Sequence, residues 1–271
     1  MLTPKTIAEL VKLIAKHGKR AVLVSGVAPS SAMPSSGKVV IDMTRTAGLG
    51  GIAAERNRVT IGTGVNLGRL AREAIGENGL IRQTASLVAN PLVRNRITLV
   101  EALDPISQHF DITTPLVLLG ARIRLQSPTG KRALSIRDYL DAATKGLKKG
   151  EIPVAVDFPK LPHGEKVGFF RVARARGQGM VSAAARMRIV RNVCLDPEIV
   201  VSSLTVVPLR SAAAEKEIGG KLVSEQGIQQ AAQQAAIEIG AFAERHNAYE
   251  QTLIEITVAR TLRGIMEGIV R

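Results

Sequence analysis

Four histidines and one cysteine are the side chains of this sequence with the widest chemical repertoire. They are His17, His109, His163, His246 and Cys194. No two histidines share a metal-binding spacing such as HxxxH, and a single thiol cannot build a multi-cysteine zinc site or hold an iron–sulfur cluster alone. The sequence also contains neither a GxSxG nucleophile elbow nor a GxxxxGK[ST] phosphate loop. We therefore expect no catalytic residue and no metal ligand in this chain.

A loop rich in small residues is the first candidate for binding an anion. Residues 21–24 are apolar and predict a strand, and the segment Ser25-Gly26-Val27-Ala28-Pro29-Ser30-Ser31 follows at once. The backbone N–H groups of such a loop can hold a phosphate. One glycine does not separate a phosphate loop from an ordinary turn, so by itself this pattern favours the turn.

A run of basic residues is the second candidate, as a docking surface for an acidic protein or as an ordinary solvated face. Against Glu165 alone, the run holds Lys160, Lys166, Arg171, Arg174, Arg176, Arg186, Arg188 and Arg191. The whole chain of 271 residues carries a formal charge of +14, which could also attract nucleic acid or an anionic membrane. Aromatic residues make up only 3%, however, which argues against reading nucleic acid by stacking. No apolar run approaches the ~20 residues of a membrane span.

The first twenty residues predict an amphipathic helix, and we expect the chain to be cytoplasmic. Thr3 is the expected N-cap, Pro4 the first helical residue and Gly18 the stop. Charges are spread along this segment, so it lacks the apolar core of a signal peptide. A single cysteine also suits a reducing compartment.

The remaining patterns predict strands in the middle of the chain and helices at its end. Expected strands cover residues 39–43, 57–61, 116–125, 152–156, 180–190 and 199–206, although the alanine-rich part at 181–188 could also be a helix. Expected helices cover residues 67–75, 135–140, 211–218, 228–242 and 248–269. The charged, glycine-bounded segment 145–150 is the best candidate for a linker.

Four ordered stretches together resemble the flavin-binding medium subunit of molybdenum hydroxylases, the group of carbon monoxide dehydrogenase and xanthine dehydrogenase. The first is Val39-Val40-Ile41-Asp42-Met43-Thr44-Arg45, and the second is Val59-Thr60-Ile61-Gly62. The third runs from Ala85-Ser86 through Val93-Arg94-Asn95 and Thr98-Leu99 to Asp111 and Gly120-Ala121. The fourth runs from Phe170-Arg171 through Ser182-Ala183-Ala184 to Pro208-Leu209-Arg210-Ser211. No single stretch is specific, but the ordered set covers nearly the whole chain.

The resemblance implies an α+β fold: a two-subdomain α/β flavin-binding module of the PCMH type, followed by a C-terminal antiparallel sheet with helices. The implied division is 1–56 and 57–146 for the two subdomains and 151–271 for the C-terminal domain. It further implies FAD as cofactor, and a molybdopterin-containing large subunit and an iron–sulfur small subunit as partners. Electrons would pass between the iron–sulfur centres and FAD. The implied cofactor-binding residues are Ser25, Gly26, Val27, Ala28, Ser30, Ser31, Arg94, Asn95, Thr98 and Asp111.

Both flavin loops depart from the family pattern in the direction that weakens binding. In the first, Val27 replaces a glycine, and Pro29 has no N–H to donate. In the second, Val100 and Glu101 replace two glycines, which places a carboxylate where a diphosphate would lie. Two alternatives therefore stay open: a flavoprotein subunit that transfers electrons, or a structural and assembly subunit that has lost the cofactor.

Overall fold

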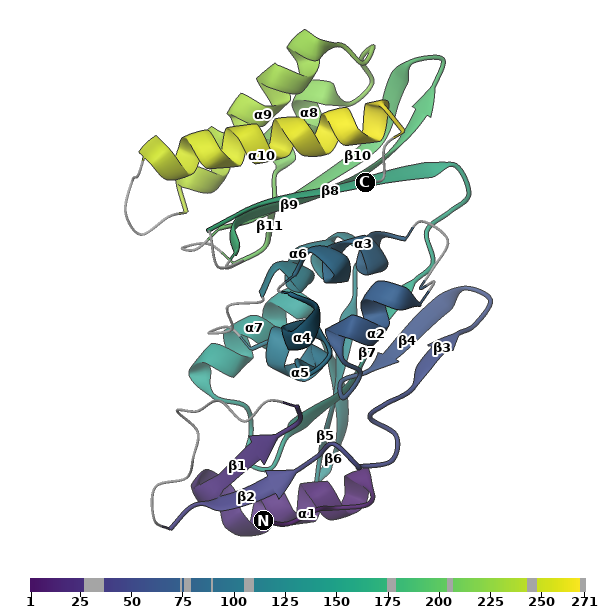
Figure 1. The fold of residues 1–271 in the computed structure, drawn as a ribbon. Helices are drawn as coiled ribbons and strands as arrows, with labels where there is room; N and C mark the ends of the chain where they lie inside the picture. The colour runs from purple at the N-terminus through teal and green to yellow at the C-terminus, as the bar shows by residue number, and fades with distance from the viewer. Residues whose placement is uncertain are drawn as a thin grey trace.

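The protein consists of three tiers, with the N-terminal tier and the C-terminal helices at opposite ends (Figure 1). The computed structural model describes residues 1–26, 37–73, 75, 79–88, 90–104, 110–174, 179–203, 207–242 and 248–268. Helices and mostly antiparallel sheets alternate along the chain, so the predicted α+β class is confirmed. No helix within these ranges is long and apolar enough to cross a membrane.

The N-terminal tier is one helix packed on two parallel strands. Helix α1 (Ile7–His17) leads through a 3-10 turn (Gly18–Arg20) into β1 (Ala21–Val24), which pairs with β2 (Val39–Asp42). The helix ends at Gly18 as predicted, but the prediction of Thr3 as N-cap is wrong. The cap is Thr6, whose hydroxyl accepts from the Glu9 N–H at 3.2 Å. Leu2 and Thr6 form parallel β-bridges with Ile41 and Ala47, and the helix begins directly after Thr6.

A five-stranded antiparallel sheet forms the middle tier, in the order β3-β4-β7-β5-β6. Its strands are β3 (Ile52–Ala54), β4 (Arg58–Gly62), β5 (Arg122–Ser127), β6 (Gly130–Ser135) and β7 (Ile152–Pro159). Strand β7 is the central one, because it pairs with β4 on one side and β5 on the other. The segment 145–150 therefore returns the chain to the same sheet. The C-terminal unit begins after β7, later than the expected start at residue 151.

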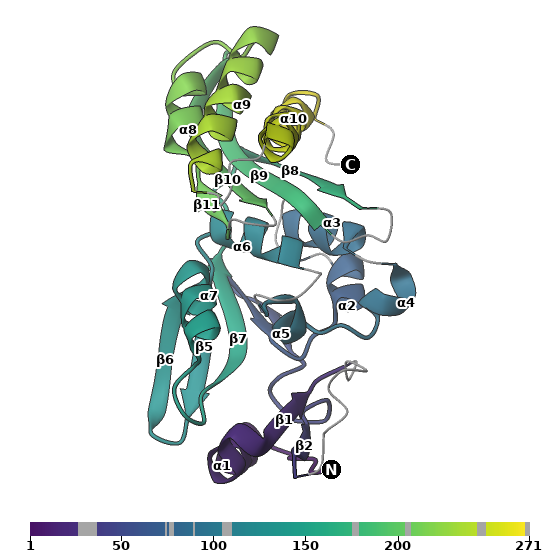
Figure 2. The ribbon, with the colours of Figure 1, turned by 90° about the vertical axis from the view of Figure 1, so that its left-hand side faces the viewer.

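Within the described residues, six short helices cover this sheet (Figure 2). They are α2 (Leu67–Arg72), α3 (Leu80–Leu87), α4 (Pro91–Arg94), α5 (Leu99–Ala102), α6 (Thr113–Leu118) and α7 (Ile136–Lys145), with a 3-10 turn at Phe110–Ile112. Helices α3, α4, α5 and α6 were not predicted. Residues 116–125 were expected to be one strand, but they divide between the end of α6, a turn and β5.

The C-terminal tier is a four-stranded antiparallel sheet in the order β11-β10-β9-β8, beneath three helices. Its elements are β8 (Glu165–Ala173), β9 (Gly179–Val190), β10 (Val193–Ser203), β11 (Leu209–Arg210), α8 (Ala212–Ile218), α9 (Glu225–Gly240) and α10 (Ala248–Met266). The alanine-rich segment 181–188 lies in β9, so its alternative assignment to a helix is excluded.

This sheet is buried on both faces, which joins the C-terminal tier to the middle one. Ala184 and Val200 pack into the core of the middle tier, whereas Ala183, Ala185 and Val201 pack under the C-terminal helices. Neighbouring residues of a strand point to opposite faces, so one strand serves two cores. The middle and C-terminal tiers therefore share a continuous packed interface.

Candidate functional site

The two loops expected to bind a cofactor meet in the structure. The Ser25 Oγ lies 2.6 Å from the Thr98 Oγ1, although 73 positions separate the two residues in the sequence. The backbones also touch, because a Cβ added to Gly26 would lie 1.8 Å from the Arg96 carbonyl oxygen. Only glycine permits so close an approach. Ser25 and Gly26 of the first predicted loop therefore lie against Thr98 of the second.

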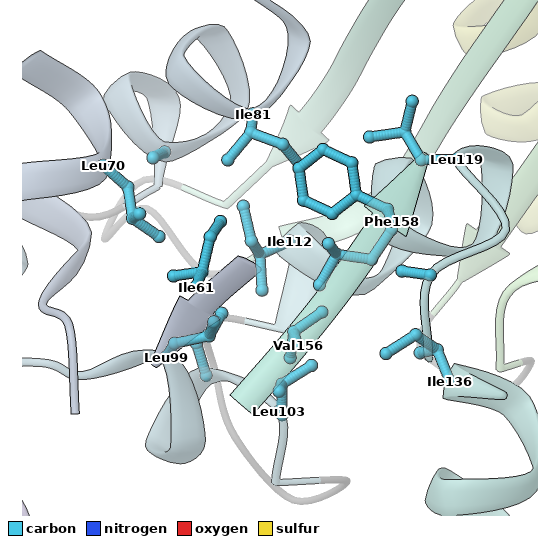
Figure 3. Close-up of a cluster of buried hydrophobic side chains, with 14 of the residues drawn as sticks. Ile61, Leu70, Ile81, Leu99, Leu103, Ile112, Leu119, Ile136, Val156 and Phe158 are labelled. Atoms are coloured by element: carbon cyan, nitrogen blue, oxygen red, sulfur yellow. The ribbon is translucent and has the colours of Figure 1, made fainter. Parts of the chain in front are cut away.

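The second loop is held in position by the core beneath it. Leu99 and Leu103, four residues apart around α5, both point into the hydrophobic cluster of the middle tier (Figure 3). Both side chains are almost fully buried. Thr98 also forms a β-bridge with Asn66, the N-cap residue of α2. These contacts turn the side chains of Thr98 and Glu101 toward the first loop.

Glu101 binds back onto the start of its own helix. Its Oε2 accepts from the Thr98 N–H at 2.8 Å and from the Thr98 hydroxyl at 3.0 Å. Because the single hydroxyl proton of Thr98 goes to Glu101, Ser25 must donate in the 2.6 Å contact between the two hydroxyls. Ser25, Thr98 and Glu101 thus form a continuous chain of hydrogen bonds, which we call the clasp.

The described donors of the second loop are satisfied within the protein. Besides the Thr98 N–H, the N–H of Leu99 donates to the Val65 carbonyl at 2.8 Å, and that of Val100 donates to the Thr63 carbonyl at 2.9 Å. A diphosphate needs such N–H groups free and needs positive charge nearby. The described residues of the second loop offer it instead a carboxylate and donors that are already bonded. They do not fit the diphosphate of FAD.

Arg94 and Asn95 lie just before the second loop and contact the neighbouring helices α2 and α3. The Arg94 guanidinium donates to the Ser86 carbonyl near the end of α3. The Asn95 Oδ1 accepts from Arg72 at 3.1 Å and lies so close to α2 that a Cβ on Gly68 would approach it to 2.1 Å. These side chains fix α4 against its neighbours.

Asp111 lies at the junction of the middle and C-terminal tiers, in the 3-10 turn that contacts α5. Its Oδ2 is 2.8 Å from the Arg171 Nη2 of β8, and both side chains are more than nine-tenths buried. Arg171 also donates to the Leu87 carbonyl at 2.5 Å. Burial raises the pKa of Asp111 to about 6, and the positive charge of Arg171 opposes that rise. This carboxyl fastens the two tiers together.

Part of the candidate loop, one arginine of the basic run and two histidines lie outside the described residues. They are Val27, Ala28, Pro29, Ser30 and Ser31, then Arg176, and His109 and His246. The described parts of the chain contain no group of three His, Cys, Asp or Glu side chains that could hold a metal ion. Cys194 is fully buried, and burial raises the pKa of its thiol to about 11.

The basic run is partly neutralised by the neighbouring strand. Arg186 pairs with both Glu165 and Glu198, at 3.3 and 2.7 Å, and Arg188 pairs with Asp196. Sequence reasoning counted charges along one segment, whereas β10 brings carboxylates across from it. The run therefore presents less positive charge than its composition indicates.

A hollow of about 600 Å³ between α1 and the middle sheet is another candidate. Arg124, Lys131 and Arg132 carry its charge, but Asp157 and Glu151 hold the two arginines at 2.8 and 2.6 Å. None of its lining residues belongs to the predicted site.

Sequence reasoning missed two features of the site. The spacing Thr98-x-x-Glu101 is that of a helix capping box, in which Glu reaches back to the N-cap backbone, and this signal could have revealed the role of Glu101. The pairing of Asp111 with Arg171 has no local signal, because the partners are 60 positions apart.

Comparisons with known proteins agree on one group. Residues 1–161 match the family described as the FAD binding domain in molybdopterin dehydrogenase. The chain is 24% identical over 270 residues to subunit alpha of the 6-hydroxypseudooxynicotine dehydrogenase complex of Paenarthrobacter nicotinovorans, covering 95% of this chain and 90% of that protein. It is 26% identical to the carbon monoxide dehydrogenase medium chain of Afipia carboxidovorans, covering 84% and 82%.

Solved structures show the same fold. Carbon monoxide dehydrogenase from Hydrogenophaga pseudoflava superimposes with a TM-score of 0.85 at 24% identity, covering 98% of this chain and 96% of that one. Quinoline 2-oxidoreductase from Pseudomonas putida 86 also gives 0.85, at 20% identity and with the same coverage.

Proposed function

Because the chain belongs to the family of FAD-binding domains in molybdopterin dehydrogenases, we propose that it is the medium subunit of a molybdenum hydroxylase complex. Its partners would be a molybdopterin-containing large subunit and an iron–sulfur small subunit, in the cytoplasm. One observation of the structure carries the proposal: Ser25–Gly26 and Arg96–Thr98, from the two loops that define the family's cofactor cleft, lie in contact.

The role of this subunit within the complex has two candidates. The first is transfer of electrons between the iron–sulfur centres and FAD, the chemistry that a bound flavin supplies. The second is a structural role without FAD, in which the fold holds the other subunits together. The clasp favours the second, because Glu101 takes up the Thr98 donors that a diphosphate would need.

Isolation of the complex tests the proposed assembly. The tagged chain is produced in its own host, purified under mild conditions and passed over a size-exclusion column, and molybdenum and iron are measured across the peak. We expect both metals to co-elute with the chain in constant ratio, in a particle well above 28.9 kDa. A chain that elutes as a monomer, with both metals in other fractions, contradicts the proposal.

A further inference from the structure

We propose that the Glu101 carboxylate takes the place of a dinucleotide's diphosphate between the two loops, so that this chain folds without retaining FAD. The inference deepens the proposed function, since it rests on the family relation and decides between its two candidate roles. The Glu101 side chain lies against Gly26 of the first loop and bonds to Thr98 of the second, so it places a negative charge between the two loops.

Atoms of the second loop already occupy the space beside Gly26. A Cβ added to Gly26 would lie 3.0 Å from the Glu101 Oε2, in addition to its clash with the Arg96 carbonyl. The open face of this glycine is therefore covered by atoms of the second loop. A phosphate needs to approach a glycine backbone closely, and here the carboxylate oxygen already lies against it.

The hydrogen bonds of Thr98 are already made within the protein. Glu101 accepts both donors of Thr98, and the Ser25 hydroxyl completes the clasp from the other loop. A ligand that enters must break these bonds before it can form its own. The clasp is also buried at both hydroxyls, with Ser25 6% and Thr98 3% exposed, so broken bonds would not be replaced by water.

The negative charge of Glu101 also opposes a phosphate at this place. If Glu101 stays in place, its carboxylate repels a phosphate at close range, and if it swings out, the Thr98 cap is lost. Either way Glu101 opposes the diphosphate.

The chain contains a matched control for this experiment. Thr6 and Glu9 repeat the same Thr-x-x-Glu spacing at the start of α1: Thr6 accepts from the Glu9 N–H, and Glu9 accepts from the Lys5 N–H at 2.7 Å. Both residues of this second cap lie in the N-terminal helix, outside the two loops. Glu9→Gln therefore removes an equivalent capping charge without touching the clasp.

The experiment measures FAD content and FAD affinity in the full-length chain. Wild type, Glu101→Gln and Glu9→Gln are purified, and the nucleotide released on denaturation is quantified by chromatography. FAD is then titrated into each protein, and binding is followed by flavin fluorescence and by the shift in melting temperature. Gln keeps an oxygen that accepts from Thr98 and removes the charge.

We expect wild type and Glu9→Gln to carry far less than one FAD per chain. Glu101→Gln should bind FAD at least about fivefold more tightly, the factor expected for two unit charges ~4 Å apart in water-like surroundings. One equivalent of FAD in the wild type would overturn the inference, and this result needs no variant to fold. Equal affinities for Glu101→Gln and Glu9→Gln would overturn it as well.

The outcome is separable from that of the proposed function. A flavin-free chain that elutes with molybdenum and iron supports both proposals. A chain that elutes with the metals and carries FAD overturns only the inference, whereas a flavin-free monomer overturns only the assembly.

Discussion

Removal of one partner from the buried Asp111–Arg171 pair should lower the free energy of unfolding strongly. Removal of both partners should lower it less. The pair lies between the middle and C-terminal tiers, and each side chain is less than a tenth exposed. Asp111→Ala leaves the guanidinium of Arg171 buried without its counter-charge. Arg171 keeps its bond to the Leu87 carbonyl, so some of its hydrogen bonding survives.

The expected magnitude follows from the balance between attraction and desolvation. Removing one partner of a buried ion pair typically costs about 3–5 kcal/mol, and the bond to Leu87 places this case near 3 kcal/mol. The pKa of Asp111 is nevertheless raised to about 6, which means that burial outweighs the attraction of Arg171. The intact pair thus adds little net stability, and Asp111→Ala combined with Arg171→Met should recover at least about 1 kcal/mol relative to Asp111→Ala alone.

Urea unfolding followed by far-ultraviolet circular dichroism measures these differences, since the chain has no tryptophan to report on unfolding. Asp141→Ala is the control, because it breaks the exposed Lys145–Asp141 pair and should cost less than about 1 kcal/mol. The reasoning is refuted if Asp111→Ala also costs less than about 1 kcal/mol. It is equally refuted if the loss of unfolding free energy in the double variant equals the sum of the losses in Asp111→Ala and Arg171→Met.

Four further results are expected. Between pH 4 and 6 the folded chain binds more protons at Asp111 than the unfolded chain does, so the free energy of unfolding should fall by up to about 3 kcal/mol as the pH rises. Urea titrations at several pH values should show this slope in the wild type and not in Asp111→Asn. Gly26→Ala should lower stability by about 1–3 kcal/mol in thermal melts, because its Cβ meets the Arg96 carbonyl, whereas Gly50→Ala, with open space around it, should not. Gly168→Ala should cost a similar ~1–3 kcal/mol, because its Cβ would lie 2.7 Å from the Thr261 carbonyl of α10, and an unchanged melting temperature would disprove that contact. Cys194 should resist a thiol reagent at pH 8 until the chain is unfolded, since its thiol is buried and its pKa is raised to about 11.

Much of the fold was readable from local patterns. The apolar run at β1 and the terminal helices carry their own periodicity, and Gly18 stops α1 as its position indicates. Helix α3 was missed because its eight residues span barely two turns and carry no capping side chain at Gly79. Helices this short gain most of their stability from the core that they cover, which the sequence does not display.

The alanine-rich strand β9 was ambiguous for a related reason. Ala183, Ala184 and Ala185 suit a helix by propensity, yet all three are completely buried within a sheet. Small side chains are needed there because the middle tier packs on one face of the strand and α10 on the other. Tertiary packing decided the structure of a segment whose local preference pointed elsewhere.

For the site, the sequence identified the places but not the contacts. The ordered motifs placed Ser25 and Thr98 in one cleft, and the 2.6 Å contact between their hydroxyls agrees with that placement. The carboxylate of Glu101 was expected to repel a ligand, but the sequence did not reveal that the chain itself binds this carboxylate. Asp111 was grouped with the cofactor residues, whereas it fastens two tiers through Arg171.

These two differences have one physical origin. A carboxylate that lies in a cleft must find donors or remain hydrated. Asp111 forms an ion pair with Arg171 of the C-terminal sheet, and Glu101 accepts hydrogen bonds from the N–H and hydroxyl of Thr98. With those donors taken, hydrogen bonds of the chain itself join the two loops. The clasp therefore holds Ser25 beside Thr98 through side chains of the chain itself.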